Sequence, residues 1–305
     1  MQLGILFLQS VHLVAAKKRI HSVEYTGGCL GSVSGSCFAS EQVRAALRRM
    51  LCTETERKNL SVSGIFRTFA AMNRHWDDIR VIAFDADDTL WDCQSWFDEV
   101  ERKCCRLLSP WATAREVSEG LFSTERKNLP LTGYGTKAFT LSLIENAVRV
   151  SREQLTGDIV MKLLELGQEL LTFPTPPLPE VQETLSQLSH LRRYQLVVFT
   201  KGELLDQENK LQRSGLEQYF SHMETVSDKT EKEYRQLCEN LGVAPEQTLM
   251  VGNSFRSDIA PALAVGARAV HIPFHVVWEL EKSEEYPHER LQKITHFGEL
   301  LQIVG

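Results

Sequence analysis

Beyond Arg80, short runs of apolar residues alternate with segments of helical periodicity. The apolar runs lack the polar–apolar alternation of a half-exposed strand, so each is typical of a parallel strand covered on both faces. The predicted strands are Val81–Phe84, Leu196–Phe199, Met223–Val226, Leu249–Val251 and Ala269–Ile272. The predicted helices between the later strands are Glu180–Leu188, Glu203–Arg213, Glu231–Leu241 and Ser257–Val265. This order predicts an α/β fold with a doubly wound, Rossmann-like parallel sheet.

A long insertion of helical periodicity separates the first two predicted strands. Its apolar residues recur at helical spacing, which is typical of amphipathic helices that pack on one another. The helices predicted there are Ser95–Leu108, Ala114–Leu121, Thr136–Val150 and Glu153–Leu171. We therefore expect a helical cap over residues 92–178, inserted into a core made of residues 78–91 and 179–305. Residues 1–77 are expected to form an N-terminal extension outside this unit, and most residues after Ile272 to form a tail.

The charge balance limits the kinds of partner. The 305 residues include 34 Lys and Arg against 40 Asp and Glu, a net charge of −6. A mildly acidic chain lacks the excess of positive charge that attracts nucleic acid or an anionic membrane, so we expect neither partner. An anionic ligand must then be held by a local site.

Cysteine usage and the N-terminus bear on location. Seven cysteines at scattered positions, without a Cys-x-x-Cys pair, indicate reduced thiols and a cytoplasmic protein. The apolar stretch Leu3–Ala16 is too short to span a bilayer. Positive charges follow this stretch, whereas in a secretory signal they precede it, so we do not expect a secretory signal.

Three acids follow the first predicted strand, in the sequence Asp85-Ala86-Asp87-Asp88-Thr89. Ligands of open α/β sheets bind beyond the carboxyl ends of the strands, so this is where a site is expected. Asp85 and Asp87 point the same way if the backbone is extended, because side chains alternate with a period of two. Two adjacent carboxylates repel each other, and a divalent cation such as Mg²⁺ relieves that repulsion. The alternative for any single Asp is a helix cap or a turn.

Three further strand ends carry groups suited to an anion or a cation. Thr200 ends the second strand, and its hydroxyl can hold a phosphate oxygen; Lys229 precedes a predicted helix and can neutralise a phosphoryl group. Asn253 and Asp258 follow the fourth strand with an amide oxygen and a carboxylate, which suit a hard cation. Each alone also reads as a capping, turn or surface residue, so their order along the chain carries the prediction.

Taken together, these segments resemble the haloacid dehalogenase-like hydrolase superfamily. That family has an Asp-x-Asp-x-Thr/Val segment after strand one, Ser or Thr after strand two, Lys near a helix start and an acidic loop after strand four. Here the segments read DADDT, Thr200, Lys229 and GNSFRSD, between Arg80 and about Ile272. The insertion resembles the first cap class of the family.

The resemblance implies roles for the matching residues. Asp85 is implied as the nucleophile that forms an aspartyl-phosphate, and Asp87 as the acid that protonates the leaving oxygen and then activates water. Thr200 and Lys229 are implied to hold the phosphoryl group. The implied Mg²⁺ ligands are the carboxylate of Asp85, the backbone carbonyl of Asp87, Asn253 and Asp258.

One of these positions distinguishes branches of the family, and another departs from the family pattern. Dehalogenases resemble this pattern without the second acid, because a halide leaves unprotonated, so Asp87 favours a phosphatase. Asn253 stands where the family usually has Asp, which lowers the negative charge around the cation. We therefore expect hydrolysis of a small phosphorylated metabolite. A phosphoglucomutase-like phosphotransferase and a catalytically weak regulatory binding protein are the alternatives, and the oligomeric state is left open.

The cap is expected to choose the substrate. Tyr134, between Gly133 and Gly135, is the preferred contact because its glycine neighbours leave it exposed on a loop. The other candidates are Trp91, Trp96, Phe97, Lys137 and Phe139. Aromatic residues at helical spacing more often pack a helix than touch a ligand.

Overall fold

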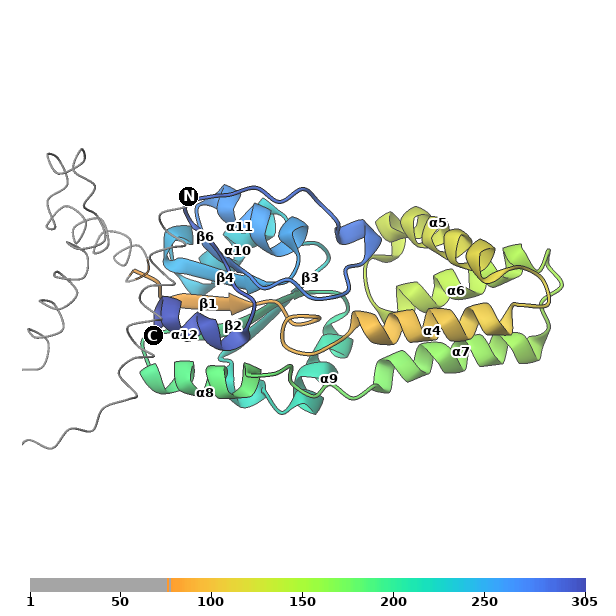
Figure 1. Cartoon of the computed structure of the whole chain (residues 1–305), viewed down its shortest axis with the longest axis horizontal. Coiled ribbons are helices and arrows are strands. Elements are labelled where there is room, and N and C mark those ends of the chain that lie inside the picture. Colours follow the sequence, from red (N-terminus) through yellow and green to blue (C-terminus); the bar gives the residue numbers. More distant parts are fainter. Residues whose placement is uncertain (1–75, 77) are drawn as a thin grey trace, which may run out of the picture. The chain divides into compact units, whose positions relative to one another are not determined.

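The computed structural model describes Trp76 and residues 78–305, so the extension expected over residues 1–77 lies, apart from Trp76, outside the described residues. Its centre is a six-stranded sheet in the order β3-β2-β1-β4-β5-β6, in which all neighbouring strands are parallel (Figure 1). The strands are β1 Val81–Phe84, β2 Gln195–Lys201, β3 His222–Val226, β4 Thr248–Gly252, β5 Arg268–His271 and β6 Leu291–Lys293. The predicted Rossmann-like class is confirmed.

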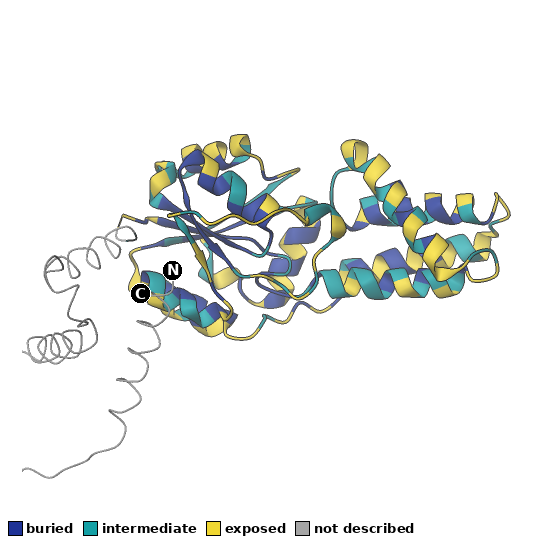
Figure 2. Cartoon of the chain, turned by 45° about the horizontal axis from the view of Figure 1, so that its top comes forward, coloured by how far each residue is buried: buried dark blue, intermediate teal, exposed yellow. Residues whose placement is uncertain are grey.

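Alternate residues of the central strands face opposite layers of helices. Ile82 and Phe84 pack with α8 (Val181–Leu191), α9 (Leu204–Ser214) and α12 (Leu300–Val304). Val81 and Ala83 pack with α10 (Glu231–Leu241) and α11 (Ala260–Val265) on the other face. The central strands are therefore buried on both sides (Figure 2), which explains their unbroken apolar runs.

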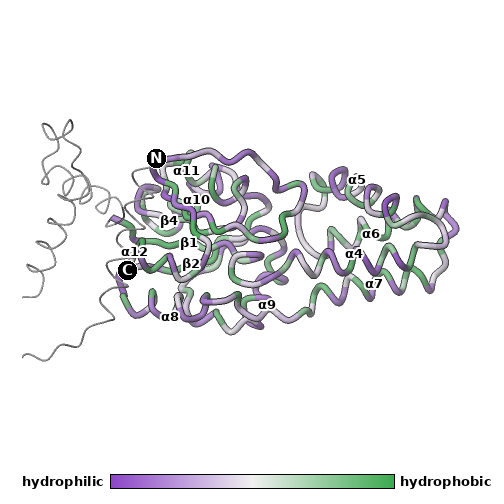
Figure 3. The backbone as a smooth tube through the Cα atoms, viewed as in Figure 1, coloured by the Kyte–Doolittle hydropathy of each residue, from purple (hydrophilic) through white to green (hydrophobic). Residues whose placement is uncertain are grey.

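The insertion folds into four helices with an apolar core of their own. They are α4 Gln94–Leu107, α5 Ala114–Thr132, α6 Thr136–Val150 and α7 Gly157–Thr172. Hydrophobic and hydrophilic stretches alternate along these helices (Figure 3), and the apolar sides meet around residues such as Leu121, Leu143 and Leu163. The prediction that the second helix ends at Leu121 is wrong. The helix continues for three further turns. The prediction missed them because Thr124 and Glu125 face inward there, and polar residues at inward positions interrupt the apolar period.

The expectation of a tail after Ile272 is also wrong. The chain adds the edge strand β6 and then α12, and Ile294, Phe297 and Leu300 are buried in the main core. The Phe297 ring stacks on that of Phe84, with centroids 6.0 Å apart. The C-terminal residues thus complete one layer of the sheet.

The register of the sheet brings the strand ends to one level. Phe84 of β1 pairs with Val198 of β2 on one side and with Val251 of β4 on the other. In this strand order the chain reverses direction across the sheet between β1 and β4, the switch point where such sheets bind ligands. Across residues 78–305 and Trp76, no helix has the length and apolar content needed to cross a membrane.

Candidate active site

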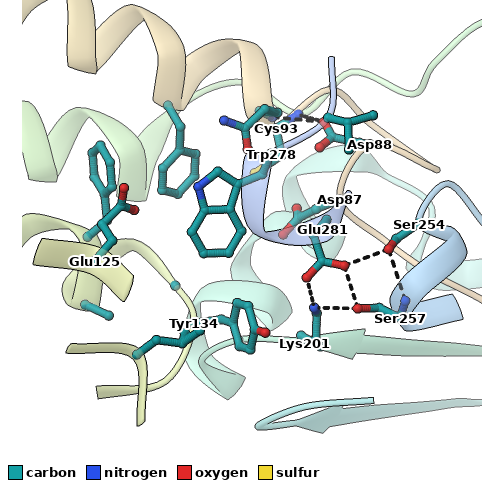
Figure 4. Close-up of a pocket in the computed structure, with 18 of the residues that line it drawn as sticks. Asp87, Asp88, Cys93, Glu125, Tyr134, Lys201, Ser254, Ser257, Trp278 and Glu281 are labelled. Carbon is teal, nitrogen blue, oxygen red and sulfur yellow. Dashed lines mark hydrogen bonds and ion pairs between the residues drawn. The ribbon is translucent and has the colours of Figure 1, made fainter. Parts of the chain in front are cut away.

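A cavity of about 520 Å³ lies between the carboxyl edge of the sheet and the cap helices. Every site residue predicted from the sequence lines it, so the structure brings strand ends, helix starts and cap together (Figure 4). These residues are Asp85, Asp87, Tyr134, Thr200, Lys229, Asn253 and Asp258.

The ammonium group of Lys229 joins two of the acids. Its Nζ lies 2.5 Å from Oδ1 of Asp85 and 2.7 Å from Oδ1 of Asp258, and the three side chains are almost fully buried. The other oxygen of Asp258 accepts a hydrogen bond from the Ser254 backbone N–H at 2.9 Å. Burial lowers the pKa of Lys229, but the charges of Asp258 and Asp85 outweigh it and raise the pKa above its usual value. Lys229 is therefore a fixed cation beside Asp85.

Asp85 keeps one oxygen turned away from Lys229. This Oδ2 accepts a hydrogen bond of 3.2 Å from the Thr89 hydroxyl, which is also 3.2 Å from Oδ1 of Asn253. Burial and then the charge of Asp258 raise the pKa of Asp85 to about 7, although Lys229 acts in the opposite direction. A carboxylate in this setting is stabilised in its ionised form by additional positive charge.

Asp87 has a separate set of partners, two of which the sequence interpretation missed. Its carboxylate accepts hydrogen bonds from Trp91 Nε1 at 2.8 Å and Gln207 Nε2 at 2.9 Å, and forms an ion pair with Lys210 Nζ at 3.0 Å. Burial raises the pKa of Asp87, but the charge of Lys210 and these hydrogen bonds outweigh it, and the pKa lies below its usual value. The only sequence signal was a polar pair three residues apart on the helix after Thr200, which reads equally well as a solvated face.

The third acid of the segment, Asp88, hydrogen-bonds to the backbone. Asp88 has a left-handed φ of 63°, which Asp tolerates better than most side chains. Its Oδ1 accepts hydrogen bonds from the backbone N–H groups of Cys93 and Gln94, at 2.8 and 2.9 Å. These amides open α4, so Asp88 fixes the point where the cap leaves the core.

Thr200 is the penultimate residue of β2 and lines the cavity. Its side chain is buried, and its hydroxyl oxygen accepts a hydrogen bond from Gln207 Nε2 at 3.1 Å, so Gln207 contacts both Asp87 and Thr200. The backbone N–H of Gly202 donates to the Val226 carbonyl at 3.2 Å and is therefore already satisfied. Thr200 lines the cavity, so its hydroxyl oxygen is the group at this strand end that can meet a ligand.

A glutamate from the supposed tail closes one side of the site. The Glu281 carboxylate accepts hydrogen bonds from Lys201 Nζ at 2.5 Å and from the hydroxyls of Ser254 and Ser257, each at 2.6 Å (Figure 4). It thereby ties the segment after β5 to the ends of β2 and β4. Burial raises the pKa of Glu281, but Lys201 and the two hydroxyls outweigh it and the pKa lies below its usual value. No sequence signal marked this residue, because it stands in an irregular segment.

The cap residues divide into those that line the cavity and those that do not. Tyr134 is half-buried, against the expectation of exposure: its ring meets Trp278 edge-on at 5.8 Å and lies 4.0 Å from Lys201 Nζ. Phe97 and Phe139 also line the cavity. The remaining candidates are absent from its lining: Trp91 is buried beside Asp87, Trp96 stacks on Phe173, and Lys137 pairs with Glu203.

The oxygen atoms at the β1 and β4 ends fit a hard divalent cation. Oδ2 of Asp85 and Oδ1 of Asn253 share the Thr89 hydroxyl as a neighbour, and carboxylate and amide oxygens are ligands that Mg²⁺ accepts. Within the described residues, no group of three or more acidic, His or Cys side chains is arranged as a metal site. The oxygen atoms of Asp85 and Asn253 therefore fit Mg²⁺ in kind. Oδ1 of Asp258 contacts Lys229 Nζ in this structure.

Comparison with known proteins gives the family. A sequence model described as haloacid dehalogenase-like hydrolase matches residues 79–266. The chain is 26% identical over 204 residues to glyceraldehyde 3-phosphate phosphatase of Methanothermobacter thermautotrophicus, covering 63% of this chain and 84% of the relative. It is 28% identical over 236 residues to the enzyme of the same name from Pyrococcus furiosus, covering 74% and 93%. The names of these relatives agree with the prediction of a phosphatase.

Solved structures agree with the sequence comparisons. A haloacid dehalogenase-like family hydrolase from Xanthomonas campestris superposes with a TM-score of 0.66 and 29% identity, over 74% of this chain and 92% of that one. The L-2-haloacid dehalogenase of Xanthobacter autotrophicus shares the fold, with a TM-score of 0.53 and 17% identity over 74% and 98%. The chain therefore belongs to the haloacid dehalogenase-like hydrolase family.

Proposed function

We propose that this hydrolase cleaves a small phosphomonoester in the presence of Mg²⁺, through an aspartyl-phosphate on Asp85. The observation that carries the proposal is the contact of Lys229 with both Asp85 and Asp258 at the switch point of the sheet. This places a fixed cation beside the carboxylate that is to attack phosphorus. Positive charge set in advance at a reacting centre stabilises the charge of the transferring phosphoryl group.

In the first half of the proposed reaction, an oxygen of Asp85 attacks phosphorus and the bond to the alcohol oxygen breaks. Lys229 and the Thr200 hydroxyl orient the phosphoryl oxygens from two sides of the cavity floor. Bound Mg²⁺ would be held by Asp85, the Asp87 carbonyl, Asn253 and Asp258, and would supply positive charge between carboxylate and phosphate. The product of this half is an acyl phosphate on Asp85 and the free alcohol.

Asp87 handles the proton in both halves. Lys210, Gln207 and Trp91 favour its ionised form, which suits the second half, when it takes a proton from the water that attacks the aspartyl-phosphate. In the first half it must give a proton to the leaving alkoxide. The arrival of an anionic phosphate next to Asp87 raises its pKa and favours the protonated form. One residue thus serves as acid and then as base.

The substitution Asp85→Asn tests the proposal. It should abolish phosphate release from 4-nitrophenyl phosphate in the presence of Mg²⁺, because the amide cannot accept the phosphoryl group. The matched control is Asp158→Asn, which changes an acid at the start of α7, outside the cavity lining. Acid quenching of the wild-type reaction should leave the phosphoryl group on the peptide that contains Asp85. Turnover by Asp85→Asn at the wild-type rate would exclude the mechanism.

A metabolite screen follows from the relatives. Glyceraldehyde 3-phosphate belongs in the first set of substrates, because curated relatives carry that name. Free phosphate distinguishes a hydrolase from a phosphotransferase, which would keep the phosphoryl group on an organic product. Absence of turnover on the whole panel by folded protein would favour the regulatory binding protein.

A further inference from the structure

The cavity has two chemically different ends. All of its cationic lining residues among those described come from the core, namely Lys201, Lys210 and Lys229, and each contacts a carboxylate. The part formed by the cap is lined by Phe97, Phe122 and Phe139. Trp278, from the segment after β5, lines the cavity as well (Figure 4). A phosphate bound at Asp85 therefore places its organic group in an aromatic chamber without a basic side chain.

One carboxylate in this chamber has no partner. Glu125 of α5 lines the cavity, and no hydrogen bond or ion pair reaches its side chain from the described residues. Burial, and then the charge of Glu101, raise the pKa of Glu125 to about 8, and an ammonium group bound beside it would lower that pKa and favour the ionised form. Two other carboxylates of the cavity lining do have partners: Glu119 pairs with Arg115, and Asp98 accepts a hydrogen bond from Gln94 at 2.9 Å.

Aromatic rings and an unpaired carboxylate together bind a cationic amine. The faces of aromatic rings attract an ammonium group, and an ammonium–carboxylate hydrogen bond is stronger than one between neutral groups. A second phosphate or a carboxylate in the same place would meet Glu125 and Glu101, and no cationic side chain of the cap lines the cavity. We infer that the cavity selects phosphomonoesters whose organic group ends in an amine, and that Glu125 is the residue that determines this specificity; the inference rests on the proposed phosphatase activity.

The size of the cavity bears on the length of that group. A volume of about 520 Å³ falls within the roughly 300–1,000 Å³ of small-molecule sites, and exceeds what a three-carbon phosphate ester fills. The amine must also reach α5, since that helix carries Glu125. We therefore expect activity to depend on the number of carbons between phosphate and amine, with an optimum above two.

The experiment compares three series of straight-chain alkyl phosphates, from two to eight carbons, that end in an ammonium, a hydroxyl or a carboxylate group. The full-length protein with Mg²⁺ should give the highest kcat/KM with the ammonium series and the lowest with the carboxylate series. At the best chain length, Glu125→Gln should lower the ammonium-to-hydroxyl ratio of kcat/KM about tenfold, mainly through KM, because a charged hydrogen bond is lost.

The control and the contrary outcomes are specific. Glu119→Gln removes a carboxylate on the same helix that is 63% exposed and already paired, and should leave the order of the three series unchanged. Equal kcat/KM for ammonium and carboxylate esters in the wild type would overturn the inference. So would an unchanged ammonium-to-hydroxyl ratio in Glu125→Gln.

Binding of the corresponding alkyl phosphonates, which are not hydrolysed, separates this inference from the proposed function. Calorimetry on the wild type should show the ω-ammonium phosphonate binding more tightly than the ω-carboxylate one, and this needs neither turnover nor a variant. Absence of phosphate release with this binding preference intact would reject the proposed function alone. Phosphate release without the preference would reject the specificity alone.

Discussion

The ammonium of Lys210 lies 3.0 Å from Oδ2 of Asp87, and its side chain is only 4% exposed. Lys210 reaches this position from α9, which begins three residues after β2 ends. A second carboxylate, that of Asp206, lies 3.6 Å from the same nitrogen. Asp87, the proposed acid, is thus positioned in two ways. It lies shortly after the end of β1, and Lys210 of α9 forms an ion pair with its carboxylate.

Replacing Lys210 by Met should lower the stability of the fold. Removing one partner leaves the Asp87 carboxylate largely desolvated, and a loss of about 3 kcal/mol in the free energy of unfolding is expected. Urea unfolding measures this loss. The control is Lys137→Met, which removes a solvent-screened pair with Glu203 and should cost much less than Lys210→Met. Equal losses in the two variants would show that the Lys210 pair does not stabilise the fold.

Asp87→Asn should affect alkyl and aryl esters unequally. An alkoxide needs a proton to leave, so hydrolysis of an alkyl phosphate should fall about 10²–10⁴-fold. 4-Nitrophenolate leaves unprotonated, so phosphorylation of Asp85 should persist while its hydrolysis slows. Rapid-quench kinetics should then show a burst of nitrophenolate ahead of free phosphate. An equal loss of rate for both esters, without a burst, would contradict the acid–base role.

Asn253→Asp should reduce the requirement for Mg²⁺. The new carboxylate adds a negative charge near Oδ2 of Asp85, across the shared Thr89 hydroxyl. We expect the Mg²⁺ concentration at half-maximal activity to fall by about tenfold, because ligand charge governs the affinity of oxygen sites for hard cations. A metal titration of phosphate release measures it. An unchanged or higher requirement would place the cation away from residue 253.

The strand-end residues of the site could be predicted because topology alone brings them together. Asp85 and Asn253 follow β1 and β4, which pair in register, and parallel strands end at the same edge. Their place therefore followed once the apolar runs were read as buried strands. The two-sided burial of the sheet made those runs unambiguous, as the alternation of Val81 and Ile82 between opposite faces shows.

Gln207, Lys210 and Glu281 could not be predicted, for two physical reasons. A lysine on an amphipathic helix has the same sequence pattern whether it faces solvent or a buried carboxylate, so Lys210 looked like a surface residue. Glu281 acts through a turn whose position depends on the tertiary packing of the segment after β5. The partner groups, and not the residues themselves, make these side chains part of the site.

The C-terminal segment was missed because β6 has 3 residues and α12 has 5, too few for a periodic pattern. Phe297→Ala tests whether this segment belongs to the core. Phe297 is 3% exposed and stacks on Phe84, the residue before Asp85. Loss of the ring should lower the free energy of unfolding by about 3–5 kcal/mol.

Activity should fall as well in the folded fraction of Phe297→Ala, because Phe84 loses the ring that fixes the end of β1. The control Leu301→Ala changes a partly buried neighbour in α12 and should cost less. Urea unfolding and phosphate release on the same samples separate the two effects. If Phe297→Ala unfolds at the wild-type urea concentration, the Phe297 ring does not stabilise the core, and its stacking on Phe84 carries no weight.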